Sequence, residues 1–536
     1  MFNKIKTTFL VLFGMAVLWS CESNLDLVPE DNRETAASAF KDPEAYKQFL
    51  AKLYAGFAIS GQDGPAGDAD LSGLDEGFSQ YMRLYFKLQE LTTDEAVIGW
   101  NDGTIKDLHN QNWTSGNEFI RTMYSRVMYQ IAQSNEYLRQ TETSVLDSRG
   151  VDSSLRTEIA TYRAEARFLR ALSYWHALDL YGNPPFVTEN DPVGAFLPEQ
   201  TSSAELFSYI EGELLAIESE MKAPGANEYG RADQGALWML LSKLYLNAEK
   251  YTGNARYSDV ITYTNKVINS DYSLVEDYQK LFLADNNTNG AQNEIIFPIT
   301  FDGINTQAYG GMTFIIHAAI GGDMDPDAFG VNGGWAGLRT TSALVNKFLE
   351  NEDDAIEEVG DERALFFTEG QSKEINDIST FTDGYAVAKY KNVDVNGNPG
   401  SDPTGDFPDT DFPMFRLADA YLMYAEAVVR GAGGSQADAV SYINELRERA
   451  YGDDSNNIST ADLSLNFIID ERARELYWEA HRRTDLIRFG KFSDGGVWPF
   501  KGGVPQGATT EAFRDLFPIP ASDLGVNTNL TQNPGY

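Results

Sequence analysis

The residue types that most often carry catalysis are sparse in this sequence. Only four histidines occur in 536 positions, and their spacing matches neither HExxH nor another zinc-binding arrangement. A GxSxG nucleophile elbow, a Walker loop and a GxGxxG turn after a predicted strand are also missing. The 80 acidic residues could still supply a pair of carboxylates for glycoside hydrolysis. Because so many acids make a chance pair easy to find, a hydrolase is an alternative without a motif behind it.

One acidic loop has the spacing of a cation site. In GGDMDPDAFG, Asp323, Asp325 and Asp327 alternate with other residues, and carboxylate oxygens are the hard ligands that Ca²⁺ prefers. The loop lacks the glycine and the closing glutamate of an EF-hand. We therefore weigh a structural Ca²⁺ against a solvated acidic turn, and we expect the protein to require no cofactor.

Aromatic side chains in glycine-rich loops are the stronger candidates for a functional site. In the stretch 61–104, Trp100 and Asn101 form a turn, while Asp75 and Arg83 flank the start of a predicted helix. A tryptophan at the tip of a turn is hard to place in a core. Flat rings beside carboxylate, guanidinium and amide groups suit a ligand that has both apolar faces and hydroxyl groups.

A second stretch, 308–340, repeats this combination. Tyr309 and Trp335 stand beside glycines, whose small size leaves ring faces open to a ligand. The alternative for either tryptophan, 100 or 335, is that it fills a gap between a loop and the scaffold. Four other tryptophans lie on helical stripes and are expected in the core: Trp113, Trp175, Trp238 and Trp478. Trp498 is undecided between facing a ligand and facing a partner.

The elements that must position these loops are mostly helices. Apolar residues recur at three- and four-residue intervals through 44–270 and 416–492, as in amphipathic helices. Two stretches, 236–268 and 417–447, have the small-residue and Tyr/Leu spacing of tetratricopeptide helix pairs. Between the helical blocks, residues 271–415 are rich in Gly, Asp, Asn and Pro, with short strand-like pieces such as EIIFPITF and YAVAKYKN. We predict a single, mostly α domain over 44–536, with the insertion 271–415 as a ligand-binding region and a C-terminal segment 493–536.

The N-terminus has the pattern of a secreted chain. Two lysines precede an apolar run from Phe9 to Trp19, which is too short to cross a bilayer. Leu18–Cys21 resembles the lipobox of bacterial lipoproteins, and Cys21 is the only cysteine in the chain. We predict a signal peptide over 1–20, then a lipidated Cys21 opening an extended segment, 21–43. The alternative is an ordinary signal peptide with an incidental cysteine.

The composition limits the classes of partner. A formal net charge of −38 argues against nucleic acid, whose phosphates attract basic surfaces. No further run of about 20 apolar residues follows Cys21, so no membrane-spanning helix is expected beyond that residue. An acidic surface is compatible with a neutral ligand.

Several long motifs, in this order, resemble the SusD/RagB family of surface lipoproteins of Bacteroidota. RAEARFLRALSYWHALDLYGNPPFVTE (163–189) is similar to a long family helix followed by a Gly-Pro turn. FRLADAYLMYAEAV (415–428) and INELRERA (443–450) are similar to its late helix pair. ERARELYWEAHRRTDLIRFGKF (471–492) is similar to its charged helix, and LFPIPASDLGVNTNLTQNPGY (516–536) to its closing segment. The resemblance implies a SusD-like fold, with tetratricopeptide-like helix pairs as the scaffold.

The charged stretch 471–492 is expected to stabilise the fold rather than to contact a ligand. We predict that its helix runs on through 464–482, with Glu475, Glu479 and Arg482 at neighbouring helical positions. Charges set among Leu476 and Trp478 would be partly buried and would therefore need partners.

The resemblance also implies a function. Family members capture nutrient, usually a glycan, and sit as a lid on a SusC-like TonB-dependent transporter in the outer membrane, without cleaving the ligand. The two aromatic stretches look like those of the starch-binding branch, where an arc of rings follows an α-glucan. By that resemblance the glycan-binding residues are Asp75, Arg83, Trp100, Asn101, Tyr309 and Trp335. The alternatives are a β-glucan such as laminarin, another glycan or a peptide, a hydrolase, and a structural protein that binds only a partner chain.

Overall fold

The protein is described here from a computed structural model that places residues 36–67 and 69–536. The predicted signal peptide and Cys21 lie outside these described residues. The chain divides into two units, 1–48 and 49–536. In the first unit α2 (Ala36–Ala39) is helical, so the prediction of an extended segment up to residue 43 is wrong for these four residues. In the same unit the rings of Phe40 and Tyr46 lie 5.0 Å apart.

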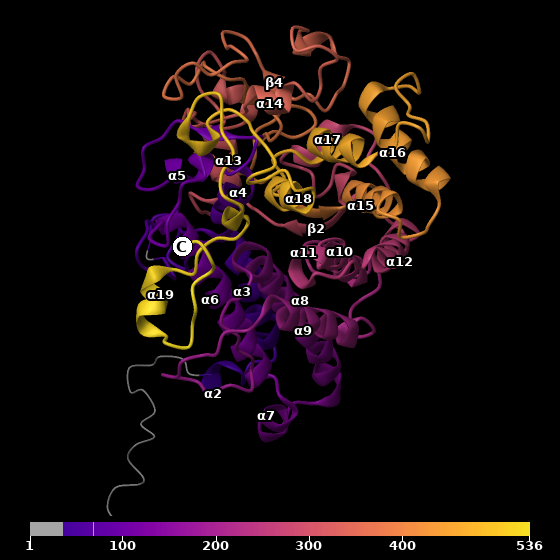
Figure 1. The fold of residues 1–536 in the computed structure, drawn as a ribbon. Coiled ribbons are helices and arrows are strands. Elements are labelled where there is room, and N and C mark those ends of the chain that lie inside the picture. Colours follow the sequence, from indigo (N-terminus) through magenta and orange to yellow (C-terminus); the bar gives the residue numbers. More distant parts are fainter. Residues whose placement is uncertain (1–35, 68) are drawn as a thin grey trace, which may run out of the picture. The chain divides into compact units, whose positions relative to one another are not determined.

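The first helical block of the second unit contains one long helix. Its elements, with α3 beginning just before the division, are α3 (Ala45–Ala58), α4 (Tyr81–Glu90), α5 (Lys106–Asn110), α6 (Glu118–Gln140), α7 (Thr143–Ser148), α8 (Ser153–Tyr181) and α9 (Ser203–Ile217). Helix α8 packs against both α6 and α9, in the lower part of Figure 1. The side chains of Asn117 and Asp152 each accept two backbone N–H groups at the first turns of α6 and α8. These caps satisfy amides that have no partner within the helix.

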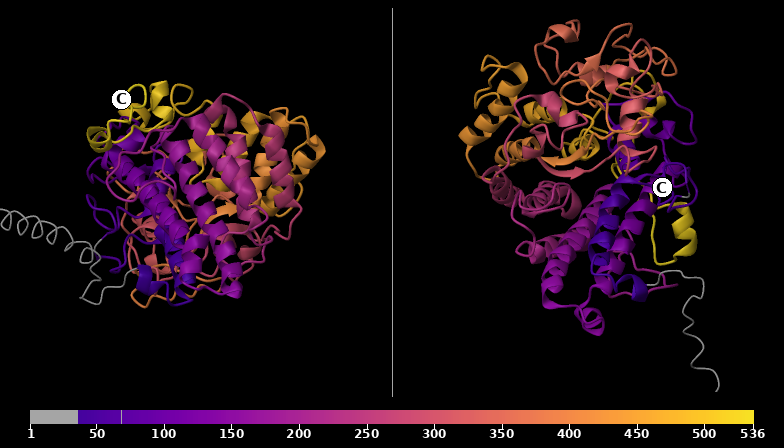
Figure 2. Two further views of the ribbon diagram at one scale, coloured as in Figure 1. Left: turned by 90° about the horizontal axis from the view of Figure 1, so that it is seen from below. Right: turned by 180° about the vertical axis from the view of Figure 1, so that it is seen from behind.

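The two predicted helix pairs are confirmed. The first pair is α10 (Gln234–Leu246) with α12 (Tyr257–Ile268), joined through the short α11 (Ala248–Thr252). The second is α15 (Leu417–Val429) with α16 (Gln436–Tyr451). Helix α12 also packs on α15, so the magenta and orange helices are neighbours in both views of Figure 2 although the whole insertion separates them in the sequence. None of the helices in the described residues combines the length and apolar character needed to span a membrane.

The insertion is loop-rich, as predicted, and its two ends are joined. Strand β2 (Ile295–Ile299) pairs antiparallel with β6 (Phe412–Arg416), and every residue of both strands is buried. The insertion therefore leaves and rejoins the scaffold at one place, and it forms the upper part of Figure 1. The other elements of this region are α13 (Gly311–Ala318), β3 (Leu338–Arg339), α14 (Ser342–Val345), β4 (Phe366–Phe367), β5 (Ala386–Val387) and 3-10 turns at Tyr278–Phe282, Ala291–Asn293, Pro326–Phe329 and Ile356–Glu358.

The charged stretch does not continue as one helix, and that prediction is wrong. Helix α17 ends at Leu476 after starting at Leu465, and α18 (Arg482–Arg488) begins after a break. Trp478 and Ala480 have φ angles of 60° and 62° in the break. Left-handed backbone costs about 1–2 kcal/mol per non-glycine residue. The break buries the indole of Trp478 completely and lets its Nε1 donate to the carbonyl oxygen of Glu95.

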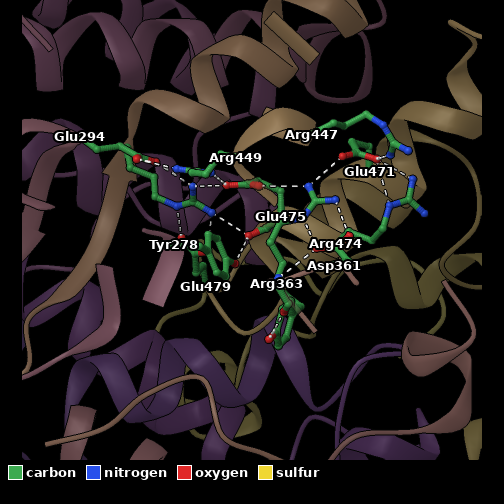
Figure 3. A network of polar contacts seen from close by, with 12 residues as sticks. Tyr278, Glu294, Asp361, Arg363, Arg447, Arg449, Glu471, Arg474, Glu475 and Glu479 are labelled. Carbon is green, nitrogen blue, oxygen red and sulfur yellow. Dashed lines mark hydrogen bonds and ion pairs between the residues drawn. The ribbon is translucent and has the colours of Figure 1, made fainter. Parts of the chain in front are cut away.

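The charges of this stretch form a buried ion network, which Figure 3 shows. Arg416 donates to Glu475 and Glu479, both at 2.6 Å, and to Glu294 at 3.0 Å. Arg363 donates to Glu471 at 2.8 Å in the same network. These side chains are at most 1% exposed. Partners of opposite charge offset the cost of burying them, as the sequence predicted, but most of the partners come from outside the charged stretch.

The C-terminal segment closes against the first helical block. Its elements are 3-10 turns at Lys501–Gly503 and Ala512–Asp515 and the short α19 (Ala521–Val526). The indole of Trp113 donates to the hydroxyl of Tyr536 at 2.6 Å, and Asn533 donates to the carbonyl oxygen of Tyr181 at the end of α8. Of the other tryptophans, Trp175, Trp478 and the undecided Trp498 are buried, whereas Trp238 is only half-buried and donates to Glu218.

Candidate ligand-binding site

A two-residue strand pair brings the two predicted aromatic stretches together. Strand β1 (Val97–Ile98) pairs antiparallel with β3, and the N–H of Gly99 donates to the carbonyl oxygen of Gly337 at 3.0 Å. Trp100 follows the end of β1 by two positions, after Gly99, and Trp335 precedes β3 by three positions. The pairing therefore places the two tryptophans side by side although 235 positions separate them in the chain.

The two indoles form one half-exposed surface. Their ring centroids lie 6.4 Å apart at an interplanar angle of 43°, and the Nε1 of Trp100 donates to the carbonyl oxygen of Trp335 at 3.1 Å. Both side chains are neither buried nor fully exposed. A Cβ on Gly337 would overlap the indole of Trp100, so this glycine makes the arrangement sterically allowed. Neither tryptophan is a core residue, and the two do not face away from each other.

The indole of Trp335 stacks on a histidine side chain. The imidazole of His317, on α13, stacks on the indole with centroids 4.8 Å apart and planes 20° apart. The two ring nitrogens of His317 lie 2.6 Å from the carbonyl oxygen of Gly333 and 2.9 Å from that of Asp406. Burial lowers the pKa of His317, while both carbonyl groups oppose that shift. His317 therefore links the Trp335 loop to the loop around Asp406.

Tyr309 lies at the other side of the same region. Its ring is half-buried and lies 5.2 Å from the ring of Phe407, which follows Asp406 directly. Gly77 allows a close approach on the opposite side, since a Cβ there would lie 2.7 Å from the Cβ of Tyr309. We name Trp100, Trp335 and Tyr309 the aromatic site.

Arg83 is placed differently from the expectation of a direct ligand contact. Its side chain is buried, and its guanidinium lies 4.1 Å from the ring centroid of Phe78 and 4.4 Å from that of Phe314. Its Nη1 donates to the carbonyl oxygen of Tyr309 at 2.7 Å. Burial lowers the pKa of Arg83 to about 9, opposed by Asp75 and Asp102. In this structure Arg83 positions the Tyr309 loop.

The two remaining predicted residues are exposed at the rim. One carboxylate oxygen of Asp75 accepts the backbone N–H of Gly77 at 3.0 Å, which closes a turn before α4. Asn101 is exposed in the turn after Trp100. The structure thus brings all six predicted residues into one region, with Asp75 and Asn101 at the rim and Arg83 underneath. Their roles in binding remain predictions.

Sequence reasoning missed the loop around residues 402–407. Asn332 donates to the carboxylate of Asp406 at 2.8 Å and to the carbonyl oxygen of Thr404 at 2.9 Å. Through Asp406 and Phe407 this loop connects the Trp335 side of the site with the Tyr309 side. The Gly/Asp/Pro-rich string SDPTGDFPD marked a loop, but only tertiary structure places that loop at the rings.

The predicted calcium loop is not gathered into a ligand set. Asp323, Asp325 and Asp327 are all exposed, and Asp325 instead caps the following 3-10 turn by accepting the N–H of Asp327. Within residues 36–67 and 69–536, no three His, Cys, Asp or Glu side chains come together in a way that could hold a metal ion.

Several carboxylates have a raised pKa, and the two whose pKa reaches about 7 lie in the interior. Burial raises the pKa of Asp411 to about 7. Burial, together with the charge of Asp94, also raises the pKa of Glu95 to about 7, although the charge of Arg482 opposes this shift. Asp411 and Glu95 are each about 1% exposed. A substrate on the surface cannot reach either group in this structure.

Comparisons with known proteins agree with the fold and the order of motifs. The model of the SusD family matches residues 350–536. The starch-binding protein SusD of Bacteroides thetaiotaomicron is 37% identical, covering 96% of each chain. SusD-like protein P25 of Formosa agariphila is 27% identical over 70% of this chain and 73% of its own.

Solved structures show the same fold at low identity. A SusD superfamily protein from Parabacteroides distasonis superimposes with a TM-score of 0.69 at 21% identity, covering 94% of this chain and 100% of its own. The surface glycan-binding protein A from Bacteroides thetaiotaomicron, in complex with laminarihexaose, gives a TM-score of 0.68 at 19% identity, covering 91% and 99%.

Proposed function

The chain belongs to the SusD family, and we propose from this membership that it is a non-catalytic glycan-binding protein whose ligand is starch or a related α-glucan. The single observation that carries the proposal is the pair of half-exposed indoles 6.4 Å apart, set in glycine-bordered loops. An apolar pyranose face packs on an aromatic ring, and the exposed Asp75 and Asn101 offer partners for sugar hydroxyl groups. The 37% identity to a starch-binding relative favours an α-glucan.

Binding without cleavage is the second part of the proposal. Cleavage of a glycosidic bond needs two carboxyl groups that flank the bond, one of them with a raised pKa. The two carboxyl groups whose pKa reaches about 7, Asp411 and Glu95, are buried, whereas the aromatic site presents rings. Incubation of maltoheptaose with the protein should leave the chain length unchanged. Shortened products at a steady rate would contradict this part.

Delivery is the third part. We infer that Cys21 is lipidated and holds the protein at the outer-membrane surface, where it passes glycan to a SusC-like TonB-dependent transporter. The lipobox-like Leu18–Cys21 and the family membership support this inference. Mass spectrometry of the N-terminal peptide should find acyl chains on Cys21, and the Cys21→Ala variant should be released from membranes.

The aromatic site is tested by removing both indoles. We expect the Trp100→Ala/Trp335→Ala variant to lose at least tenfold in affinity for amylopectin, about 1.4 kcal/mol, because the stacking surface is gone. Retardation in an amylopectin affinity gel measures the effect. Trp238→Ala is the matched control, since Trp238 is also half-buried but lies on the scaffold helix α10. Unchanged retardation of the double variant would reject the site.

The choice of glycan is tested by competition. Maltoheptaose should displace the protein from amylopectin, whereas laminarihexaose should not. Displacement by laminarihexaose alone would keep the family role and change the ligand to a β-glucan.

A further inference from the structure

A second hollow lies outside the aromatic site. It has a volume of about 390 Å³ and is formed by the loop between α9 and α10, the turn after α12, and strand β2 with the residues before it. None of its lining residues belongs to the aromatic site or to the loop 402–407. Hollows of this size are within the range that binds small ligands.

The walls of this hollow are fixed in place. The hydroxyl of Tyr272 donates to the carboxylate of Asp233 at 2.7 Å, and the same oxygen accepts the N–H of Gly225 at 2.7 Å. Gly235 leaves room for the tyrosine ring, since a Cβ there would lie 2.6 Å from the Cε2 of Tyr272. Gly230 has a φ of 85°, a conformation that favours glycine. The shape is therefore preformed, which reduces the entropy lost on binding.

The lining combines apolar and polar surfaces. Ile295, Ile296 and Pro298 of β2 are among the apolar lining residues, and all three are largely buried. The aromatic rings of Tyr229 and Tyr272 also line it, and Tyr229 is 40% exposed.

Polar groups in the same wall have unused hydrogen-bonding capacity. Gln292 accepts the N–H of Gly290 through its Oε1, but its Nε2 has no hydrogen-bond partner within the described residues. The side chains of Asn293 and Asp271 likewise have no partner in residues 36–67 and 69–536, and both are exposed. Rings, an apolar wall and available amide and carboxylate groups form the same combination that suits a pyranose.

A smaller hollow continues the first one. It has a volume of about 330 Å³ and shares Asn227, Glu228 and Arg231 with the larger hollow. Arg231 is fixed by two hydrogen bonds to the buried Glu165. Because the hollows adjoin, neighbouring sugar units of one chain could occupy both.

We propose that the hollow around Tyr229 and Tyr272 is a second, independent carbohydrate-binding site for a neutral oligosaccharide. This inference rests on the proposed function, since it takes the same class of ligand. Two sites on one protein would retain a long polymer more strongly than either alone, because the second contact becomes intramolecular. The hollow lies in the protein surface between scaffold and insertion, so it requires no movement of the aromatic site.

The test counts sites with a ligand too short to reach both. Isothermal titration with maltotriose should give two sites in the intact protein. The Trp100→Ala/Trp335→Ala variant should keep one site, and the Tyr229→Ala/Gln292→Ala variant should keep the other. The second variant should also reduce retention on amylopectin by at least threefold. Tyr229→Phe retains the ring and should bind as the intact protein does.

Phe196→Ala is the matched control, since Phe196 is 38% exposed and lies outside both hollows. Loss of all maltotriose binding in the tryptophan variant would overturn the second site and leave the proposed function intact. Binding that depends only on Tyr229 and Gln292 would instead reject the aromatic site and keep the second one.

Absence of a second site for both maltotriose and laminaritriose would also overturn the proposal. If the Tyr229→Ala/Gln292→Ala variant then failed to co-purify with its transporter, the hollow would belong to a protein partner. Circular dichroism should show that each variant retains the helical signal of the intact protein.

Discussion

The ion network around Arg416 and the aromatic site differ in what their side chains face. In the network, charged groups are almost completely buried and face one another. In the aromatic site, uncharged rings are half-exposed, and the buried cation Arg83 donates to the backbone carbonyl group of Tyr309. A region rich in acids and bases is therefore structural, and a region of half-exposed rings is the candidate for binding. Burial and pairing, rather than residue type, separate the two.

The largest expected effect comes from breaking the network. Arg416→Met leaves the carboxylates of Glu475, Glu479 and Glu294 without a shared partner in the interior. We expect the free energy of unfolding to fall by about 3–5 kcal/mol, measured by urea denaturation. Glucan affinity of the folded fraction should change less than twofold. Arg256→Met is the control, because Arg256 is 36% exposed and its ion pairs should contribute less than about 1 kcal/mol.

We expect low pH to reduce stability through the buried titratable groups, because the aromatic rings of the site do not titrate in that range. Burial lowers the pKa of three histidines to about 3, so they stay neutral in the folded protein above that pH: His109, His176 and His481. In the unfolded chain the same histidines have the ordinary pKa of about 6.5 and bind protons below it. Stability is therefore lost as the pH falls towards 3. Three such groups together lower the free energy of unfolding by about 4 kcal/mol per pH unit.

Carboxylates of the interior change this profile in two ways. Although burial opposes it, arginine partners lower the pKa of Glu471 and Asp485 to about 2, so their contribution is present above the ordinary carboxyl value and is lost below it. Burial raises the pKa of Glu90 and Glu95, so the folded protein binds these protons at a higher pH than the unfolded chain does. The free energy of unfolding gains from this difference as the pH falls, but only down to about 4.5, where the unfolded chain also becomes protonated. Denaturation should therefore steepen below pH 4.5. A flat profile between pH 4.5 and 3 would contradict the buried neutral histidines.

The smallest expected effect comes from changing how the indole of Trp100 packs in the aromatic site. Gly337→Ala places a methyl group where the indole of Trp100 lies, so the ring must move. We expect a cost of about 1–3 kcal/mol in stability and a loss of several-fold in glucan affinity, measured by affinity gel. Gly333→Ala is the control, because a Cβ there meets no atom within 4 Å. Equal affinity of both variants would show that the indole geometry does not matter for binding.

Periodicity predicted most of the helical scaffold, because each helix buries one face. Both helix pairs agree with the pattern of apolar residues. The break at Trp478 was missed, since its left-handed residues include a tryptophan and an alanine, which carry no local signal for that conformation. Helical spacing alone suggested Glu475 and Glu479 as partners of Arg482, whereas the structure pairs them with Arg416 from β6.

The residue types of the candidate site were predictable from the sequence. Which of its side chains are exposed and which are buried beneath them was less predictable. Glycine neighbours predicted open ring faces for Trp100, Tyr309 and Trp335, and all three side chains are half-buried in the structure. Position along the chain could not show that Arg83 lies underneath, because its burial depends on Phe78 and on Phe314 of α13. The place of the 402–407 loop at the site could not be predicted from the sequence either. It depends on contacts with His317 and Tyr309 that form only in the folded chain.

The two-residue pairing of β1 with β3 has a consequence for biogenesis. The indole at position 100 can meet its neighbour only after the chain has been synthesised beyond residue 339, so a shorter nascent chain has no paired rings. The aromatic site therefore forms only when two segments that are far apart in the sequence have folded together.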